Sequence, residues 1–383
     1  MFTKMRTLLV ISVVALLTAC GGGGGGGGGS TTPSTTVTRT TSTPIAIAAT
    51  SYQNLKEVGA TQIQMPSGTE WNAATTLADF DRTGNLDMFT AKQIYDASTS
   101  TPQTAQASVF KFYKRMSDGS LVEDTTKLTS NAGCIHPRKA IVADYNGDGR
   151  PDVFVACHGY DANPFPGERN KVVLSNGNGT YTIQDASTDV GFWHSATALD
   201  VDSDGDIDVV AVSNFDANKF VTFLNNGSGS FTREAGTRFP ALAGNYYTIE
   251  AVKVDADSIP DIVIGGHDWN DGGGQAHTII LTGNANNNWT GSTQTVVPSV
   301  ANEGVVLDFT VTGTGATKTL WVLRTSGGDG TFYQSVTVQR YDVATAVSSV
   351  AYTQRSGTWT PWLIQVSTTI RTLFSTYNLT ING

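Results

Sequence analysis

One acidic segment of nine residues recurs along the chain and constrains the fold more than any other feature. Its clearest copy runs from Asp200 to Asp208 and carries five aspartates at alternate positions. Successive copies begin 65, 56, 53 and 55 residues apart, at Asp79, Asp144, Asp200, Lys253 and Asp308. Self-similarity at a nearly constant period is typical of a chain built from repeated structural units.

Each acidic segment lies between short apolar or β-branched runs. Those runs are too short for helices, so each acidic segment is predicted to be the turn of a β-hairpin. A second hairpin in each unit is indicated by Asn-Gly and Gly-X-Gly turns within residues 172–183, 221–232 and 279–290. Two hairpins make four strands per unit, and four-stranded units at this period are typical of propeller blades.

Loops of the form D-x-D-x-D-G-x-x-D in repeats of this length resemble the FG-GAP/VCBS family, the calcium-loop β-propellers that also occur in integrin α-subunit heads. The resemblance covers roughly residues 61–350, and the loops at Asp144 and Asp200 match at every ligand position. It implies an all-β propeller of four-stranded blades. Counting repeats predicts six blades, with seven as the alternative, and we expect strands from residues 51–68 to close the ring.

The alternating carboxylates predict calcium sites. Carboxylates at positions 1, 3, 5 and 9 of a glycine-bent turn converge and repel one another unless a cation neutralises them. Calcium binds about six to eight oxygens, and the carbonyl at position 7 adds one. We expect two or three structural calcium ions. Their predicted ligands are Asp79, Asp81, Thr83, Asn85 and Asp87 in loop one, Asp144, Asn146, Asp148, Arg150 and Asp152 in loop two, and Asp200, Asp202, Asp204, Asp206 and Asp208 in loop three.

The alternative, a solvated acidic turn without an ion, stays open, most of all for loop one, where Thr83 is a weak fifth ligand. An EF-hand is excluded because the twelfth position lacks a glutamate and no helices flank the loops. In loop four, Lys253 replaces the first ligand. Its ammonium is expected to lie between Asp255, Asp257 and Asp261 in place of an ion.

A second pattern recurs at the other end of the same hairpins, where an aromatic residue is followed by Asp or Asn. Four of the five histidines are predicted to lie at this end. Either these side chains pack between blades, or they form pockets suited to a sugar or a protein loop. The candidate rim comprises His136, Arg138, His158, Tyr160, Trp193, His194, Asn214, His267 and Trp269.

The N-terminus predicts export and lipidation. Lys4 and Arg6 precede an apolar run that is too short for a permanent membrane span, so residues 1–19 are predicted to be a signal peptide. The sequence Leu17–Cys20 resembles the bacterial lipobox, which implies a lipid on Cys20. Gly21 fits, by resemblance to enterobacterial sorting rules, an outer-membrane position facing the periplasm or the surface. Residues 20–50 are predicted to be a flexible tether, and residues 51–383 are predicted to be the propeller domain.

The cysteines and the net charge bear on a possible disulfide and on the class of partner. An exported pair, Cys134 and Cys157, can be oxidised, but the register of the predicted hairpin does not place the two opposite each other, so the disulfide stays open. The formal net charge of −9 argues against a nucleic-acid partner.

The favoured function is a lipid-anchored adhesion or protein-interaction module of the cell envelope, with a protein or glycan ligand. The alternative is a carbohydrate-binding or carbohydrate-active propeller, a lectin or a polysaccharide lyase, in which His136, Arg138, His158 and His194 supply acid, base and charge stabilisation. An envelope scaffold is a third hypothesis. The sequence contains no GxSxG, HExxH or phosphate-binding glycine loop, so a non-enzyme is favoured while catalysis stays open.

Overall fold

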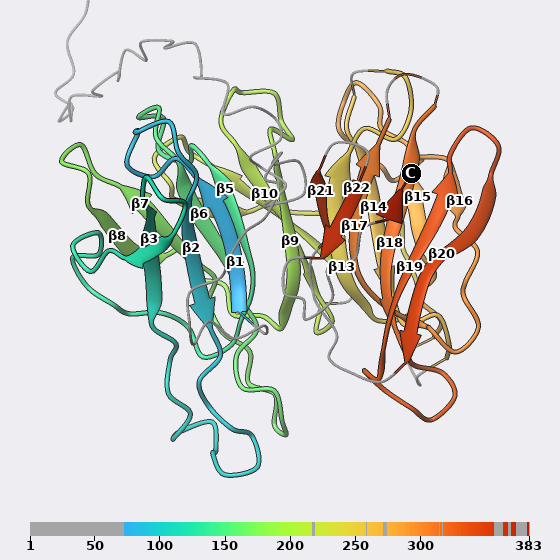
Figure 1. Ribbon diagram of the computed structural model, residues 1–383, viewed down its shortest axis with the longest axis horizontal. Coiled ribbons are helices and arrows are strands. Elements are labelled where there is room, and N and C mark those ends of the chain that lie inside the picture. The colour runs from blue at the N-terminus through green and yellow to red at the C-terminus, as the bar shows by residue number, and fades with distance from the viewer. Residues whose placement is uncertain are drawn as a thin grey trace, which may run out of the picture. The chain divides into compact units, whose positions relative to one another are not determined.

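The computed structural model describes residues 73–355, apart from 217–218, 258, 271–273, 314 and 316, together with strands at 363–366, 369–372 and 381–382. The regular elements of this part are all strands (Figure 1). Within the described residues, no helix is long and apolar enough to cross a membrane. The signal peptide, Cys20, the tether and the closing strands expected in residues 51–68 lie outside the described residues.

Twenty strands form five four-stranded antiparallel sheets in chain order. Blade one contains β1 (Ala73–Ala78), β2 (Asp87–Lys92), β3 (Phe110–Arg115) and β4 (Leu121–Glu123). Blade two contains β5 (Pro137–Ala143), β6 (Asp152–Cys157), β7 (Lys171–Ser175) and β8 (Tyr181–Asp185). Blade three contains β9 (Trp193–Leu199), β10 (Asp208–Ser213), β11 (Phe220–Asn225) and β12 (Phe231–Arg233). Blade four contains β13 (Tyr246–Val252), β14 (Asp261–Gly266), β15 (Ile279–Leu281) and β16 (Gln294–Val296). Blade five contains β17 (Val305–Thr312), β18 (Thr319–Thr325), β19 (Ser335–Asp342) and β20 (Val347–Arg355).

The prediction of six blades, or of seven, is wrong: the described residues form five four-stranded blades. The region where a sixth was expected contains a three-stranded sheet of β21 (Leu363–Val366), β22 (Thr369–Thr372) and β23 (Ile381–Asn382). These strands have four, four and two residues. The described strands of the C-terminal segment are therefore fewer and shorter than those of the five blades.

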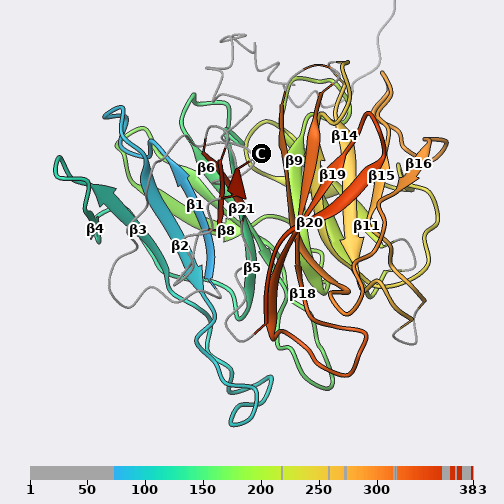
Figure 2. The ribbon, with the colours of Figure 1, turned by 45° about the vertical axis from the view of Figure 1, so that its right-hand side comes forward.

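The first strand of each blade is its inner strand. Successive first strands contact one another, from β1 to β5, β9, β13 and β17, and β17 contacts β21. This is the arrangement of blades around a propeller axis. Figure 2 shows the first blade in blue, with β1 to β4 following one another outward in chain order. The blades thus place the ends of their inner strands together.

Apolar side chains from facing blades form the core. One cluster joins Phe89 and Phe112 of blade one to Val142 and Val155 of blade two. Because each blade is covered on both faces, β6, β9 and β10 are buried along their whole length. A strand that is buried on both faces is expected to have a continuous apolar sequence rather than an alternating one, and the sequences of these strands are mostly of this kind.

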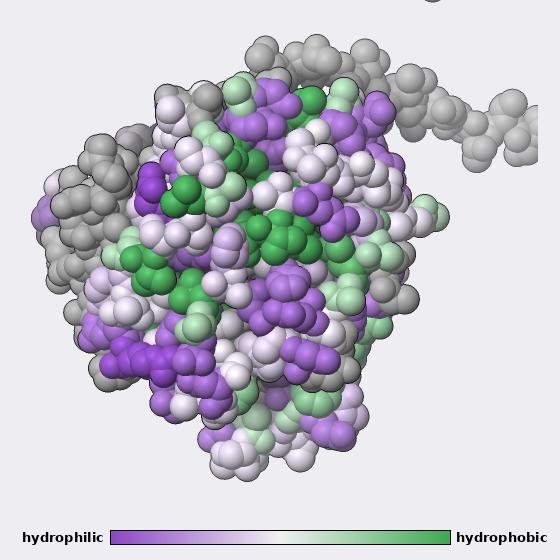
Figure 3. All heavy atoms as spheres, turned by 90° about the vertical axis from the view of Figure 1, so that its right-hand side faces the viewer, coloured by the Kyte–Doolittle hydropathy of each residue, from purple (hydrophilic) through white to green (hydrophobic). Residues whose placement is uncertain are grey.

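The outer strands face solvent. On β20, Val347 and Val350 are exposed in a strand that is otherwise mostly exposed as well. Figure 3 views the side of the molecule at the right of Figure 1, where β16 and β20 lie, and shows apolar patches among hydrophilic side chains. Apolar atoms contribute more than half of the accessible surface of a typical folded protein, so this mixture is ordinary.

The first hairpin of four blades turns at an acidic loop, as predicted. The flanking pairs are Ala78↔Asp87, Ala143↔Asp152, Leu199↔Asp208 and Val252↔Asp261, so the four loops share one register. Gly84, Gly149 and Gly205 have φ of 84°, 78° and 93°, a backbone conformation that favours glycine.

The fifth copy is different. The segment from Asp308 to Thr312 continues β17 and is no turn, because its alternating apolar residues extend the strand. The side chain of Asp308 is buried.

Cys134 and Cys157 form a disulfide with their Cα atoms 5.9 Å apart. The strand register pairs Cys157 with Pro137, not with Cys134. The disulfide therefore depends on how the segment before β5 approaches the end of β6, which the hairpin register alone does not specify.

Candidate functional site

The aspartate at the ninth position of each acidic loop is a buried cross-link. Its carboxylate accepts a hydrogen bond from a backbone N–H of its own loop, two in the case of Asp152, and another from a backbone N–H at or just after the end of the third strand. The donor pairs are Asp81 and Arg115 for Asp87, Tyr145 and Ser175 for Asp152, Val201 and Asn225 for Asp208, and Val254 and Gly283 for Asp261. These four carboxylates thus connect both hairpins of a blade.

Burial makes the charge of these carboxylates costly. It raises the pKa of Asp87 to about 6 and the pKa of Asp152 and Asp208 to about 7, against the opposing effect of their backbone hydrogen bonds. A cation beside these groups stabilises the ionised form.

Loop three has the donor set of a divalent cation site. Carboxylate oxygens of Asp200, Asp202 and Asp208 lie within 4.8 Å of one another. Oδ1 of Asp200 is buried and has no hydrogen-bond partner among the described residues. A hard oxygen-binding ion such as calcium fits these residues, since it would give the buried oxygen a partner and neutralise the cluster.

Loop two uses more of its carboxylate oxygens in local hydrogen bonds. Asp144 accepts from the backbone N–H groups of Asp148 and Gly149 at 3.1 and 2.8 Å. Asp148 accepts from Oγ of Ser175 at 3.0 Å. Among the described residues, the carboxylates of loops one and three, but not those of loop two, gather in threes within 4.8 Å of one another.

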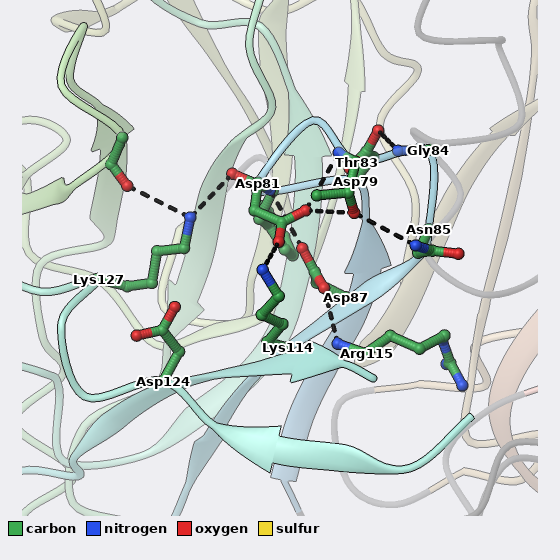
Figure 4. A network of polar contacts seen from close by, with 12 residues as sticks. Asp79, Asp81, Thr83, Gly84, Asn85, Asp87, Lys114, Arg115, Asp124 and Lys127 are labelled. Atoms are coloured by element: carbon green, nitrogen blue, oxygen red, sulfur yellow. Dashed lines mark hydrogen bonds and ion pairs between the residues drawn. The ribbon is translucent and has the colours of Figure 1, made fainter. Parts of the chain in front are cut away.

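A lysine from outside loop one contacts the carboxylates of that loop. Asp79, Asp81 and Asp87 gather as their counterparts in loop three do, but Nζ of Lys114 on β3 lies 2.7 Å from Oδ2 of Asp81 (Figure 4). Although burial acts in the opposite direction, hydrogen bonds from Lys114 and Thr83 lower the pKa of Asp81 to about 2.

The lysine of loop one has no counterpart in loops two and three. By strand register, the residues equivalent to Lys114 are Leu174 and Leu224. Comparing third strands between blades could have found this difference, whereas reading the loops alone could not.

Loop four does not have the predicted arrangement. Lys253 is exposed rather than enclosed by aspartates. Lys318, immediately before β18, approaches the loop instead, and its Nζ donates to the carbonyl oxygens of Lys253 and Asp255 at 2.5 Å. The cation at this loop comes from the next blade.

A pocket of about 510 Å³ lies at the opposite end of the inner strands. It is lined by the beginnings of β5, β9, β13 and β17, whereas the acidic loops follow the ends of β5, β9 and β13. We call it the rim pocket. Its volume is within the range of about 300–1,000 Å³ that is common for small-molecule sites.

Histidine and aromatic rings form a continuous series beside the rim pocket. Successive ring centroids are 4.9, 4.4, 4.7, 4.3 and 4.1 Å apart along His136, His158, His194, Tyr247, His267 and Trp269. We call these six residues the aromatic series. It extends from blade two to blade four, and four of its members line the pocket: His136, His194, Tyr247 and His267.

Charged groups accompany these rings. Arg138 and Asp161 line the pocket, and Nη1 of Arg138 lies 3.5 Å from Nε2 of His136. Lys139 also lines it and forms a buried ion pair with Glu250 at 2.5 Å. Burial, with a smaller effect of Arg138, lowers the pKa of His136 and His194 well below the usual value. These rings are therefore neutral near pH 7.

The structure brings His136, Arg138, His194 and His267 of the predicted rim to the pocket. His158 is fully buried between His136 and His194. Trp269 stacks on His267 with an interplanar angle of 14°.

The other three predicted rim residues are structural. The hydroxyl of Tyr160 donates to the carbonyl oxygens of Ala97 and Ser100, so this side chain holds the segment after β2. Trp193 is buried in the core of blades two and three. Asn214 exchanges hydrogen bonds with the backbone of Tyr246. Each side chain is aimed at a neighbouring segment rather than at the pocket.

Tyr247, Lys139 and Ser195 line the pocket but were not predicted. A signal for them exists in the repeat. Counting back from the starts of loops two, three and four, the sixth preceding residues are Arg138, His194 and Tyr247, and the fifth are Lys139, Ser195 and Thr248. All six line the pocket. Aligning the strand starts as well as the loops would have identified them.

A family model described as FG-GAP-like repeat matches residues 144–211 and 200–264. No curated protein matches the chain. A putative 6-phosphogluconolactonase from Bacteroides uniformis ATCC 8492 is similar in structure, with a TM-score of 0.46, 10% identity, and coverage of 77% of this chain and 80% of that chain. A putative exo-beta-1,3-galactanase from Bifidobacterium bifidum s17 has a TM-score of 0.40, 8% identity, and coverage of 74% and 92%.

These structural similarities do not bear on the chemistry of the site. The matched repeats include loops two and three, whose hairpins turn in the same register as those of loops one and four. The chain is thus a β-propeller that contains FG-GAP-like repeats in residues 144–264.

Proposed function

We propose that this propeller is a binding module whose rim pocket holds a saccharide. The observation that carries the proposal is the aromatic series along one side of a pocket that also contains Arg138 and Asp161. Sugar rings have apolar C–H faces that pack on aromatic rings and hydroxyls that hydrogen-bond to charged side chains. A pocket with both kinds of group matches that chemistry.

The proposal predicts which residues matter for binding. Tyr247→Ala removes a ring that lies 4.7 Å from His194 and 4.3 Å from His267, so it opens the middle of the aromatic series. Tyr113→Ala is the matched control, since Tyr113 lies on β3 of blade one and does not line the pocket.

Glycan-array screening of the full-length protein, followed by calorimetry with the best ligand, tests the proposal. We expect Tyr247→Ala to weaken binding at least about tenfold, the equivalent of 1.4 kcal/mol. Tyr113→Ala is expected to bind as the wild type does. Binding of no saccharide, or equal binding by Tyr247→Ala, contradicts the proposal.

A protein ligand is the second candidate, and exposed aromatic residues near the pocket favour it. Phe165, Phe215, Phe332 and Tyr333 are 38%, 55%, 48% and 45% exposed. Phe215 stacks on Phe192, which lines the pocket. Exposed aromatic groups of this kind are enriched in protein interfaces.

The two candidates predict different effects of one substitution. Phe215→Ala changes the exposed surface and leaves the pocket lining intact. It should abolish co-purification of an envelope protein in an adhesion or interaction module, and should have little effect on saccharide binding.

We also propose the setting in which the module acts. Loops one to three bind two or three structural calcium ions, and the lipid on Cys20 with the tether holds the propeller at the cell envelope, in the outer membrane. Radiolabelled palmitate incorporation that is lost in Cys20→Ser tests the anchor. Calcium retention measured by elemental analysis after dialysis tests the loops.

A further inference from the structure

A cluster of ring nitrogens and a carboxylate beside the rim pocket has a different chemistry from that of the acidic loops. Ligand atoms of His136, His158 and Asp161 lie within 4.8 Å of one another. Nε2 of His158 also lies 3.1 Å from Nε2 of His194. We call these four residues the histidine cluster.

The other ring nitrogens indicate which atoms carry protons. Nδ1 of His194 lies 3.1 Å from the carbonyl oxygen of Phe192, and Nδ1 of His158 lies 3.4 Å from that of Gly159. A carbonyl oxygen only accepts, so Nδ1 of His194 carries its hydrogen and Nε2 presents a lone pair to His158. The hydrogen of His158 is either on Nε2, where it points at His194, or on Nδ1, where the two Nε2 lone pairs face each other.

The two facing Nε2 atoms are shielded from solvent. His158 is fully buried and His194 is 8% exposed, so water does not solvate these atoms well. A metal ion stabilises the tautomer in which both hydrogens are on Nδ1, because both buried Nε2 lone pairs then become ligands.

The surroundings match those of metal-binding histidines. Such histidines almost always donate their second ring N–H to a carbonyl or carboxylate, and Nδ1 of both His158 and His194 faces a carbonyl oxygen. In a tetrahedral zinc site with Zn–N distances of about 2.0–2.1 Å, neighbouring ligand atoms are about 3.3 Å apart. The 3.1 Å separation of the two Nε2 atoms is close to that value.

Asp161 requires a small closing movement, since its Oδ1 lies 4.0 Å from Nε2 of His158. Its carboxylate supplies the negative charge that offsets an ion. His136 lies beside this carboxylate rather than on the ion: Nη1 of Arg138 only donates, so Nε2 of His136 accepts, and Nδ1, which carries the hydrogen, lies 4.0 Å from Oδ2 of Asp161. Arg138 opposes a cation and favours an anionic group bound beside it.

We propose that His158, His194 and Asp161, beside His136, form a site for a transition-metal dication such as Zn²⁺. Imidazole and carboxylate are suitable ligands for such ions, whereas the all-oxygen acidic loops suit calcium. The site is separate from the calcium loops and does not depend on whether the pocket binds a saccharide.

Cobalt is the most direct probe, because four-coordinate Co²⁺ has a strong visible absorption. The full-length protein is freed of transition metals on a chelating resin and kept in excess calcium, so that the acidic loops are saturated. Co²⁺ is then titrated in, and Zn²⁺ is used to displace it. We expect one equivalent of Co²⁺ to bind with the tetrahedral spectrum, and Zn²⁺ to remove that spectrum.

Two substitutions and a control assign the ligands. Asp161→Asn changes a side chain that is 43% exposed and should leave the melting temperature unchanged while weakening Co²⁺ binding at least about tenfold. His194→Gln should abolish the tetrahedral spectrum. His277→Gln is the control, since His277 is the one histidine outside the rim, lies near Asp268 and is 41% exposed.

The proposal is overturned if no Co²⁺ or Zn²⁺ binds in calcium buffer, if Asp161→Asn binds Co²⁺ with wild-type affinity, or if His277→Gln weakens binding as much as His194→Gln does. Saccharide binding by the metal-free protein would leave the proposed function intact while the metal site fails.

Discussion

Substitutions at Asp208 and Asp202 separate the two roles that aspartates have in an acidic loop. Asp208 is fully buried and accepts hydrogen bonds from the N–H groups of Asn225 and Val201 at 2.7 and 2.9 Å. Asp202 is exposed and accepts one bond, from the N–H of Asp204. Both carboxylates belong to the proposed calcium site.

The expected magnitudes follow from these contacts. Asp208→Ala leaves two buried N–H groups without an acceptor, at about 1–3 kcal/mol each, so it should reduce the free energy of unfolding by about 2–6 kcal/mol without calcium. Asp208→Asn keeps one acceptor oxygen and should cost roughly half as much. Asp202→Ala should stay within about 0.5 kcal/mol of wild type in the same buffer.

Calcium is expected to make Asp202→Ala less stable than wild type. A ligand that binds only the folded state at 100 times its Kd adds about 2.7 kcal/mol to stability. Asp202→Ala should lose the part of this increment that loop three contributes, although it is nearly neutral without calcium.

Urea unfolding with and without calcium, read as the transition midpoint at constant slope, measures both effects. The proposed cross-linking role of Asp208 is wrong if Asp208→Ala and wild type have the same urea midpoint in calcium-free buffer. The argument for an ion fails if Asp202→Ala keeps the whole calcium increment.

Three further substitutions test other contacts. Lys114→Leu installs at loop one the residue type found at the equivalent positions of loops two and three, and calorimetry should show tighter calcium binding by that loop; an unchanged affinity would mean that Lys114 does not compete with the ion. Cys134→Ser opens a loop closed over 23 residues, and the free energy of unfolding should fall by about 3.5 kcal/mol in non-reducing urea titrations; equal midpoints for variant and wild type would refute this. Burial raises the pKa of Glu168 to about 7, so its stabilising contribution is present below about pH 4.5 and is lost as pH rises through about 7. The melting temperature of Glu168→Gln should therefore rise relative to that of wild type from about pH 5 to about pH 8, and a difference that does not vary with pH would contradict this assignment.

Those parts of the candidate site that lie within a single hairpin could be predicted from the sequence. The acidic loops, their glycines and the histidine-rich opposite end all recur at fixed offsets from the loop start. Tyr160, Trp193 and Asn214 share those offsets but turn toward neighbouring segments. Offset along a strand specifies which end of a blade a residue occupies, whereas the packing between blades decides which way its side chain points.

Contacts between distant segments could not be read from the repeat. Lys114 reaches Asp81 across 33 residues, and Lys318 reaches Lys253 from the following blade. The pairing of Cys134 with Cys157 likewise depends on the bend before β5. In each case the partner is specified by how two chain segments meet in space.

The sequence by itself determined the local units of this protein: apolar strands of fixed spacing, and turns that only glycine and aspartate make readily. These follow from backbone geometry and from the burial of alternate or continuous apolar residues within some ten positions. The tertiary structure alone decided that five blades form, that six rings line up from blade two to blade four, and that His158 faces His194. Those outcomes depend on packing between blades, where side chains more than 30 residues apart compete for the same space.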